Sequence, residues 1–202
     1  MLVINIREVS QSAMVGRDTL RRLSLAAMFL AIGLILPFFT GQIPEIGNLL
    51  LPMHLPVFLC GLICGWQYGG IVGLVMPVMR SFMFGNPPLY PSAMAMSAEL
   101  AIYGFIIGLI YGRFKKQNIA SVYIALVSAM LVGRAMWGGA QVLLLGMTGS
   151  TFTWQAFVAG AFFKAIPGIV IQLVLVPTIM SILHLTGLYR FRKHGFSAKN
   201  AK

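Results

Sequence analysis

The sequence predicts an all-α integral membrane protein, a bundle of six transmembrane helices with both termini in the cytoplasm. Two observations support this fold class. The 202 residues are 58% hydrophobic and only 9% charged, and their mean hydropathy is +0.87, which leaves little polar sequence for a soluble domain. Long apolar runs alternate with short polar segments, and nearly all basic residues lie in every second segment. The positive-inside rule assigns those segments to the cytoplasm.

The basic residues define the predicted topology. All but three of the 15 Lys and Arg residues flank the apolar runs on one side, namely Arg7, Arg17, Arg21, Arg22, Arg113, Lys115, Lys116, Arg190, Arg192, Lys193, Lys199 and Lys202. The loops around 40–52, 85–91 and 148–155 contain no Lys or Arg. We therefore expect a cytoplasmic N-terminal segment (1–19), a membrane domain (20–187) and a basic cytoplasmic tail (188–202). The net charge of +11 then reflects topology and contact with anionic head groups, which argues against nucleic-acid binding.

The first three predicted spans differ in length. Leu23–Phe39 is long for a signal peptide and lacks a small-x-small cleavage site after it, so we expect it to remain as a helix. Met53–Trp66 and Gly70–Phe84 are shorter than the roughly 20 residues of a perpendicular span. We expect these two to be tilted, interrupted or re-entrant helices, joined by a tight link at 66–69.

The last three predicted spans are Ser92–Tyr111, Ile119–Met147 and Ala156–Leu185. Pro167 and Pro177 interrupt the last of them, and a proline inside a helix removes a hydrogen bond and kinks the axis.

Small residues recur four apart in several spans, a spacing that allows helices to approach closely in lipid. Two glycine series are expected to pack inside the bundle: Gly61, Gly65, Gly69 and Gly73, and Gly104, Gly108 and Gly112. Ala27 and Ala31 differ because the first span can lie at the edge of the bundle, where these alanines can face another protein. Cys60 and Cys64 have neither redox nor metal-binding spacing and are interpreted as small core residues.

Four ionisable residues fall inside the spans: Arg80, Glu99, Arg134 and Lys164. Each would cost about 2.5 to 3.5 kcal/mol if it faced lipid at mid-depth, so we expect all four to face the interior. At about 1.5 Å per helical residue, all lie between the predicted outer face and the bilayer centre. This distribution indicates a pocket open to the outside rather than a pore, and the alternative is a structural network of ion pairs.

Polar and aromatic neighbours extend the predicted pocket. Tyr103 lies one turn from Glu99, and Trp137 and Gln141 share a helix face with Arg134. The complete set of predicted ligand-binding residues is Glu99, Tyr103, Arg134, Trp137, Gln141, Lys164, His54, Asn86 and Trp154. Rings and a few polar groups in a concave site suit a small metabolite, although the residues from the membrane surface, His54 and Trp154, can also be interfacial anchors.

Charge and missing motifs narrow the function. Three intramembrane cations against one carboxylate favour an anionic ligand over a cation, unless Arg80 extends to the surface. The sequence has no phosphate-binding loop, nucleophile–histidine pattern or metal-binding motif, so we expect no catalytic residue, metal or cofactor. Matched broken helices of a self-sufficient transporter are also missing. The chain is therefore expected to bind a metabolite and to obtain energy from partners.

Four segments, Leu50–Gly61, Gly85–Pro91, Ala98–Gly104 and Gly133–Gly138, carry a resemblance to a known family. Together with length and topology, they resemble a substrate-binding S component of energy-coupling factor (ECF) vitamin transporters, over residues 20–185. The resemblance implies six helices, a high-affinity vitamin pocket formed by the last three helices and the external loops, a coupling membrane subunit and two cytoplasmic ATPases that use the ATP.

The resemblance also implies a docking site and a release step. Ala27 and Ala31 match the family's Ala-x-x-x-Ala docking motif, and docking is expected to topple the whole bundle. Pantothenate and vitamin B6 forms fit the charge count better than thiamine does, and riboflavin or its phosphate is also compatible. A stand-alone secondary transporter and an intramembrane enzyme are the alternative functions.

Overall fold

A computed structural model describes residues 6–39, 52–147, 165–189 and 191 of the chain. These residues form helices and connecting turns, without a strand among them. In chain order the elements are α1 (Ile6–Phe39), α3 (His54–Cys64), α4 (Trp66–Phe84), a π-helical turn η1 (Leu89–Ala93), α5 (Met94–Arg113), α6 (Ile119–Met147) and α8 (Ile166–Leu185). The prediction of an all-α protein is confirmed.

Four helical segments of the described chain are long and apolar enough to cross a membrane: Gly16–Phe38, Leu89–Arg113, Ile119–Met147 and Ile166–Leu185. The 11-residue α3 is apolar but shorter, as expected for the second span. The total of six spans and the cytoplasmic location of both termini stay predictions.

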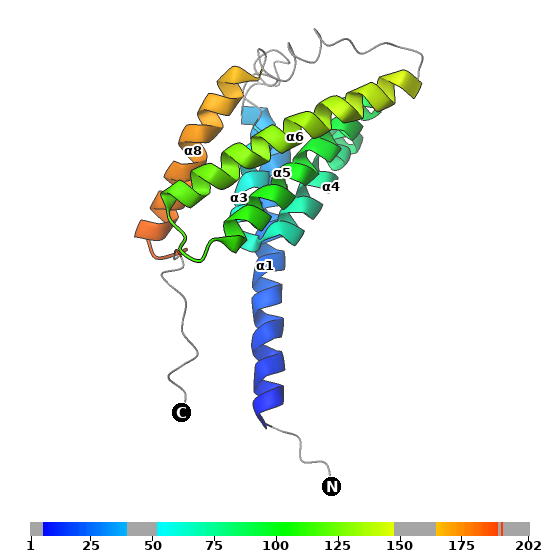
Figure 1. The fold of residues 1–202 in the computed structure, drawn as a ribbon. Coiled ribbons are helices and arrows are strands. Elements are labelled where there is room, and N and C mark those ends of the chain that lie inside the picture. The colour runs from blue at the N-terminus through cyan, green and yellow to red at the C-terminus, as the bar shows by residue number, and fades with distance from the viewer. Residues whose placement is uncertain (1–5, 40–51, 148–164, 190, 192–202) are drawn as a thin grey trace.

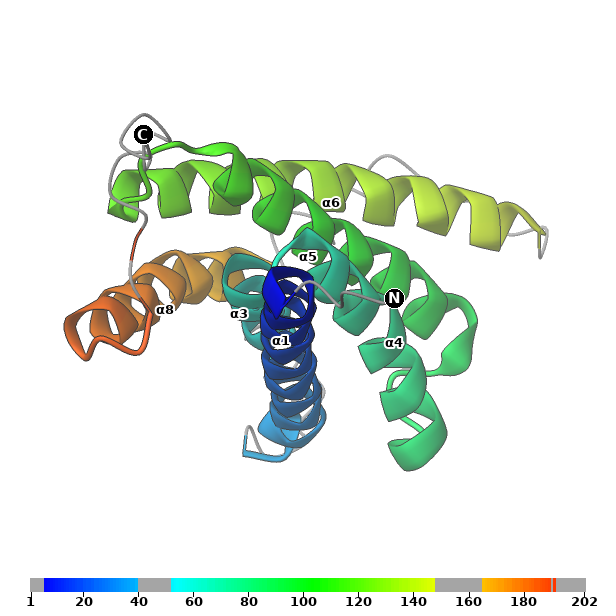
Figure 2. The ribbon, with the colours of Figure 1, turned by 90° about the horizontal axis from the view of Figure 1, so that it is seen from below.

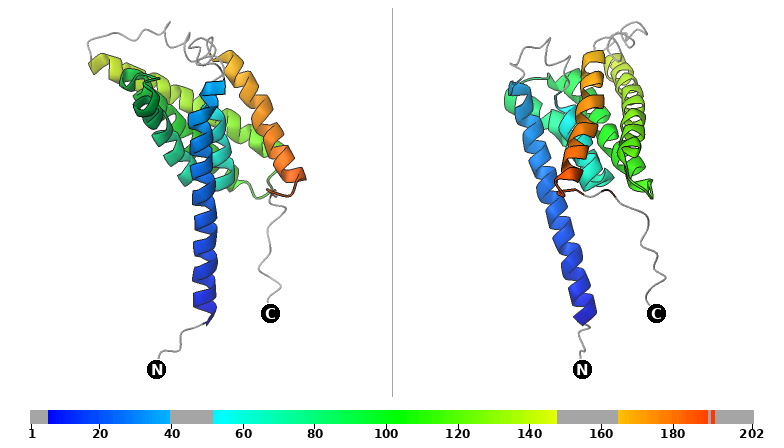
Figure 3. Two further views of the ribbon diagram at one scale, coloured as in Figure 1. Left: turned by 180° about the vertical axis from the view of Figure 1, so that it is seen from behind. Right: turned by 90° about the vertical axis from the view of Figure 1, so that its left-hand side faces the viewer.

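The helices pack around α5, which contacts α3, α4 and α6 (Figure 1). Helix α1 packs on α3 and α4, and α8 packs on α6 and α3. The first half of α1 projects beyond the rest of the bundle, as Figures 1 and 3 show. Seen from below, α8 and α1 lie on either side of α3, and α6 crosses behind α5 (Figure 2).

Glycines bring the backbones of α3, α4 and α5 into direct contact. A Cβ atom added at Gly69 of α4 would lie 2.6 Å from Cα of Gly61 and 2.7 Å from the carbonyl oxygen of Gly104. Real Cβ atoms do not approach other atoms so closely, so any larger residue would push the three helices apart. Internal packing of both glycine series is confirmed for these positions and for Gly73 and Gly108. Gly112 departs from it, because a Cβ there would meet open space.

The predicted link at 66–69 is wrong. Residues Trp66 to Gly69 form the first turn of α4, where the amide of Gly69 donates to the carbonyl of Gly65 at 3.0 Å. Gly65 alone separates α3 from α4, and its φ of 102° belongs to the region that favours glycine. A single glycine therefore completes the reversal that was expected to need four residues.

The last predicted span, Ala156–Leu185, is described only from Ala165 onward. Its helix, α8, begins at Ile166 and places Pro167 in the first turn, where a missing amide hydrogen costs no helical hydrogen bond. Pro167 therefore lies at the start of this helix, and Pro177 lies inside it as predicted. The predicted span Ile119–Met147 has the bounds of α6.

Candidate ligand site

A buried carboxylate on α5 organises the most polar part of the described interior. Glu99 is 2% exposed, and its Oε1 atom faces three elements. The hydroxyl of Tyr103, one turn later on α5, donates to it at 2.7 Å. Arg134 of α6 places Nη1 3.0 Å away, and His54 of α3 places Nε2 3.9 Å away. We call these four residues the Glu99 cluster.

Close helix packing makes the Glu99 cluster possible. The ring of Tyr103 packs against two rings of α3, Phe58 at a centroid distance of 4.9 Å and His54 at 5.4 Å. A Cβ at Gly133 would overlap the Tyr103 ring, so glycine at this position lets α6 approach α5. This approach carries the next residue, Arg134, to the carboxylate. The sequence did not lead us to predict that Gly133 lets α6 approach α5. The available signal was its position directly before the intramembrane Arg134.

The electrostatics of the cluster are those of a buried ion pair. The side chains of Glu99 and Arg134 are 3% and 10% exposed. Neither charge is tolerable alone in a low-dielectric interior, and each compensates the other. The pair therefore contributes no net charge.

Two buried polar atoms on α6 have no hydrogen-bond partner among the described residues. The Nε atom of Arg134 and the Oε1 atom of Gln141 are buried there without a hydrogen bond. The two residues lie seven apart on α6, and therefore on one helix face, with the half-buried Trp137 between them. Buried polar atoms normally have partners, so this face of α6 offers a donor and an acceptor to a bound molecule.

Comparison with known proteins identifies the family. The sequence model of one family, described as "ECF transporter, substrate-specific component", matches residues 21–180. The chain belongs to this family. Neither the search of curated proteins nor the search of solved structures found a match.

Membership confirms the resemblance seen in the sequence. ECF substrate-specific components are multi-pass membrane proteins that bind a vitamin or a related metabolite for uptake. They are transporter subunits that work with the other subunits of an ECF module, and they are not enzymes. The identity of the substrate and the partner subunits are finer points that this match leaves to proposals.

The structure brings together only some of the residues predicted to bind this component's ligand. His54, Glu99, Tyr103 and Arg134 converge, and Trp137 and Gln141 continue along the same face of α6. Asn86 is exposed in the segment between α4 and η1, and no hydrogen bond or ion pair joins it to the Glu99 cluster in the described structure. Lys164 and Trp154 lie outside the described residues.

Arg80 does not belong to the Glu99 cluster. This corrects the prediction that three intramembrane cations and one carboxylate share one site. The Nη1 atom of Arg80 donates to the carbonyl of Leu34 at 3.0 Å, and its guanidinium lies 5.5 Å and 5.6 Å from the rings of Phe38 and Phe84. The side chain is buried and does not extend to the surface. A carbonyl oxygen and two aromatic faces stabilise this cation where α1 and α4 end. Arg80 therefore adds no positive charge to the predicted ligand site.

The two alanines of the predicted docking motif are exposed on α1, whereas Ala26 and Phe29 face the bundle and are 4% and 7% exposed. Cys60 and Cys64 are buried on α3 and are not joined by a disulfide bond. The described residues contain no group of three His, Cys, Asp or Glu side chains placed to hold a metal ion.

Proposed function

We propose that this ECF substrate-specific component binds its vitamin on the Glu99 cluster and the adjoining face of α6. The observation that carries the proposal is the combination of a buried ion pair with two buried polar atoms that no described residue satisfies. A purely structural pair would be expected to leave fewer such atoms, because each costs free energy when it is buried without a partner. A ligand that supplies an acceptor to Arg134 and a donor to Gln141 removes that cost.

The chemistry of these groups bears on the substrate. Arg134 is already paired with Glu99 through Nη1, and its Nε atom is directed elsewhere. A carboxylate or phosphate is the strongest acceptor for an arginine donor, which keeps pantothenate and the vitamin B6 forms as the favoured substrates. Because Arg80 donates to Leu34 and the charge of Arg134 is balanced by Glu99, the net positive charge behind this preference now depends on Lys164. Riboflavin, which can stack on Trp137 and hydrogen-bond to Gln141, is the neutral alternative.

Energy is proposed to come from a separate ATPase module through a coupling subunit that docks on α1. The exposure of Ala27 and Ala31 supports this docking surface, because two small residues on one face let another helix approach closely. Toppling of the bundle on docking would then turn the ligand site toward the cytoplasm.

Mass spectrometry of small molecules that co-purify with the full chain tests the substrate proposal. Calorimetry then measures the affinity for pantothenate, pyridoxal 5′-phosphate, riboflavin and thiamine. We expect saturable binding of one of the first three, weakened in Arg134→Ala and unchanged in Arg113→Ala, where an exposed arginine at the end of α5 is removed. Equal binding by both variants would move Arg134 to a structural role. Uptake by the isolated chain in proteoliposomes under an ion gradient would instead support a secondary transporter.

A further inference from the structure

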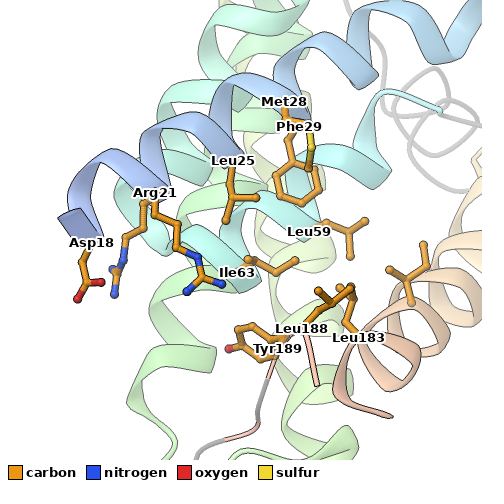
Figure 4. A pocket seen from close by; sticks show the side chains of 12 residues that line it. Asp18, Arg21, Leu25, Met28, Phe29, Leu59, Ile63, Leu183, Leu188 and Tyr189 are labelled. Atoms are coloured by element: carbon orange, nitrogen blue, oxygen red, sulfur yellow. The ribbon is translucent and has the colours of Figure 1, made fainter. Parts of the chain in front are cut away.

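A cavity outside the Glu99 cluster lies between α1, α3 and α8 (Figure 4). Its volume is about 580 Å³. Its walls are apolar and include Leu25 and Phe29 of α1, Leu59 and Ile63 of α3, and Leu183 of α8. We call this cavity the α1–α3–α8 groove. Leu59 is five residues from His54 on α3, so the nearest part of the groove lies about 7.5 Å from the Glu99 cluster along that helix.

The groove has a basic end. Arg21 and Arg22 of α1 line it there together with Asp18 and Tyr189. Figure 4 shows Arg21 near Asp18, next to the apolar walls. Arg22 donates to the carbonyl of Cys64 at 3.5 Å, at the C-terminal end of α3 where helical carbonyls lack partners.

Arg21 is the more available cation. It is exposed, and within the described chain no hydrogen bond or carboxylate within ion-pairing distance engages it, although Asp18 lines the same end. Two arginines against one aspartate leave this end of the groove positive. An apolar channel inside a membrane protein with cationic groups at one end is complementary to a molecule with a hydrocarbon chain and an anionic head.

We propose that the α1–α3–α8 groove binds one acidic phospholipid, with its phosphate against Arg21 and Arg22 and an acyl chain between the three helices. The lipid belongs to the leaflet in which these arginines lie. Basic residues next to membrane helices attract anionic head groups, and arginine hydrogen-bonds a phosphate well. The seven residues from Arg22 to Phe29 extend about 10 Å along α1, which seats the first part of an acyl chain.

The lining of the groove favours a lipid as its occupant. Apolar walls lead to an end that carries two arginines. A phospholipid matches both features, because its acyl chain is apolar and its phosphate is anionic. Since α1 packs on α3 and α4 while α8 packs on α3 and α6, a chain in this groove would fill the space between α1 and α8.

The test uses the full chain in detergent with two lipids of identical acyl chains, dioleoyl phosphatidylglycerol and dioleoyl phosphatidylcholine. Native mass spectrometry measures how many molecules stay bound, and thermal unfolding measures the stabilisation by each lipid. We expect one phosphatidylglycerol to be retained at least tenfold more tightly than phosphatidylcholine, and to raise the unfolding temperature more.

Three variants locate the site. Arg21→Gln combined with Arg22→Gln removes the head-group contacts. Leu183→Trp places a larger side chain from the apolar wall into the groove without changing the charge. Both variants should abolish the preference for phosphatidylglycerol. Arg113→Gln is the matched control, an exposed arginine outside the groove, and should keep the preference. Vitamin affinity should be unchanged in all three, which shows that the variants are folded and keeps this test separate from that of the ligand site.

Several results would overturn the proposal. Equal retention of the two lipids, or an unchanged preference in the double arginine variant, excludes an anionic site. Equally tight binding of glycerol phosphate, which has no acyl chain, removes the role of the apolar walls. If the double variant keeps the lipid and instead loses co-purification with the coupling subunit, the groove belongs to a protein partner.

Discussion

Replacing Arg134 by alanine tests the candidate ligand site most directly, because it acts on stability and on binding in different ways. The change leaves the carboxylate of Glu99, 3% exposed, without the guanidinium that lies 3.0 Å away. Removing one partner of a buried ion pair costs about 3 to 5 kcal/mol, since the other charge stays buried. The hydroxyl of Tyr103 still donates to Glu99 and offsets part of that cost.

The effect on binding has a separate origin. If Nε of Arg134 donates one charge-assisted hydrogen bond to the vitamin, its loss costs about 1.5 to 3 kcal/mol. That range corresponds to a roughly ten- to 150-fold rise in Kd. Calorimetry at a temperature well below the unfolding transition of the variant measures this term without interference from unfolding.

A double variant separates the two effects. In Glu99→Gln with Arg134→Ala, both charges are gone, so we expect much of the lost thermal stability to return. Binding should stay weak, because the donor to the ligand is still absent. Arg134→Lys keeps the positive charge but lacks Nε, and should be more stable than the alanine variant while still binding weakly.

Two outcomes would refute this reasoning. A double variant that binds the vitamin as the wild type does would show that neither charge meets the ligand. A single Arg134→Ala variant with unchanged unfolding temperature would show that the pair is solvated in the membrane, and the burial argument would fail with it.

The other predictions concern docking, topology and packing. Ala27→Trp should retain vitamin binding but lose ATP-dependent uptake in cells that contain the partner subunits, and the same should hold for residue 31; Ala120→Trp, at an exposed site on α6, is the control. Loss of binding together with uptake would place the alanines inside the bundle. A cysteine that replaces Lys199 should react only with membrane-permeant thiol reagents. Reaction with an impermeant reagent from outside would contradict the predicted cytoplasmic C-terminus. Gly133→Val should lower stability and weaken binding because its side chain overlaps the Tyr103 ring; normal behaviour would contradict the close approach of α6.

Much of the fold was predictable because membrane helices are constrained by their own sequence. Apolar length fixed α6 at Ile119–Met147, and the composition required helices. The pairing of Glu99 with Tyr103 was predictable for the same reason, since residues four apart on one helix are neighbours wherever that helix packs.

The boundaries at glycine and proline were less predictable. Gly65 follows the last residue of α3 and Pro167 lies in the first turn of α8, and both residue types allow more than one structural role. A glycine can pack against a helix or adopt a positive φ, and a proline can kink a helix or start one.

The sequence by itself determined that Arg80, Glu99 and Arg134 must avoid lipid, because an isolated charge in hydrocarbon is too costly. Which partner each would find was decided only by the tertiary structure. Gly133 lets α6 approach α5, so Arg134 meets the carboxylate, whereas α4 packs on α1 and gives Arg80 the carbonyl of Leu34 instead. The two arginines have the same chemistry, and their different surroundings follow from contacts between helices that are far apart in the chain.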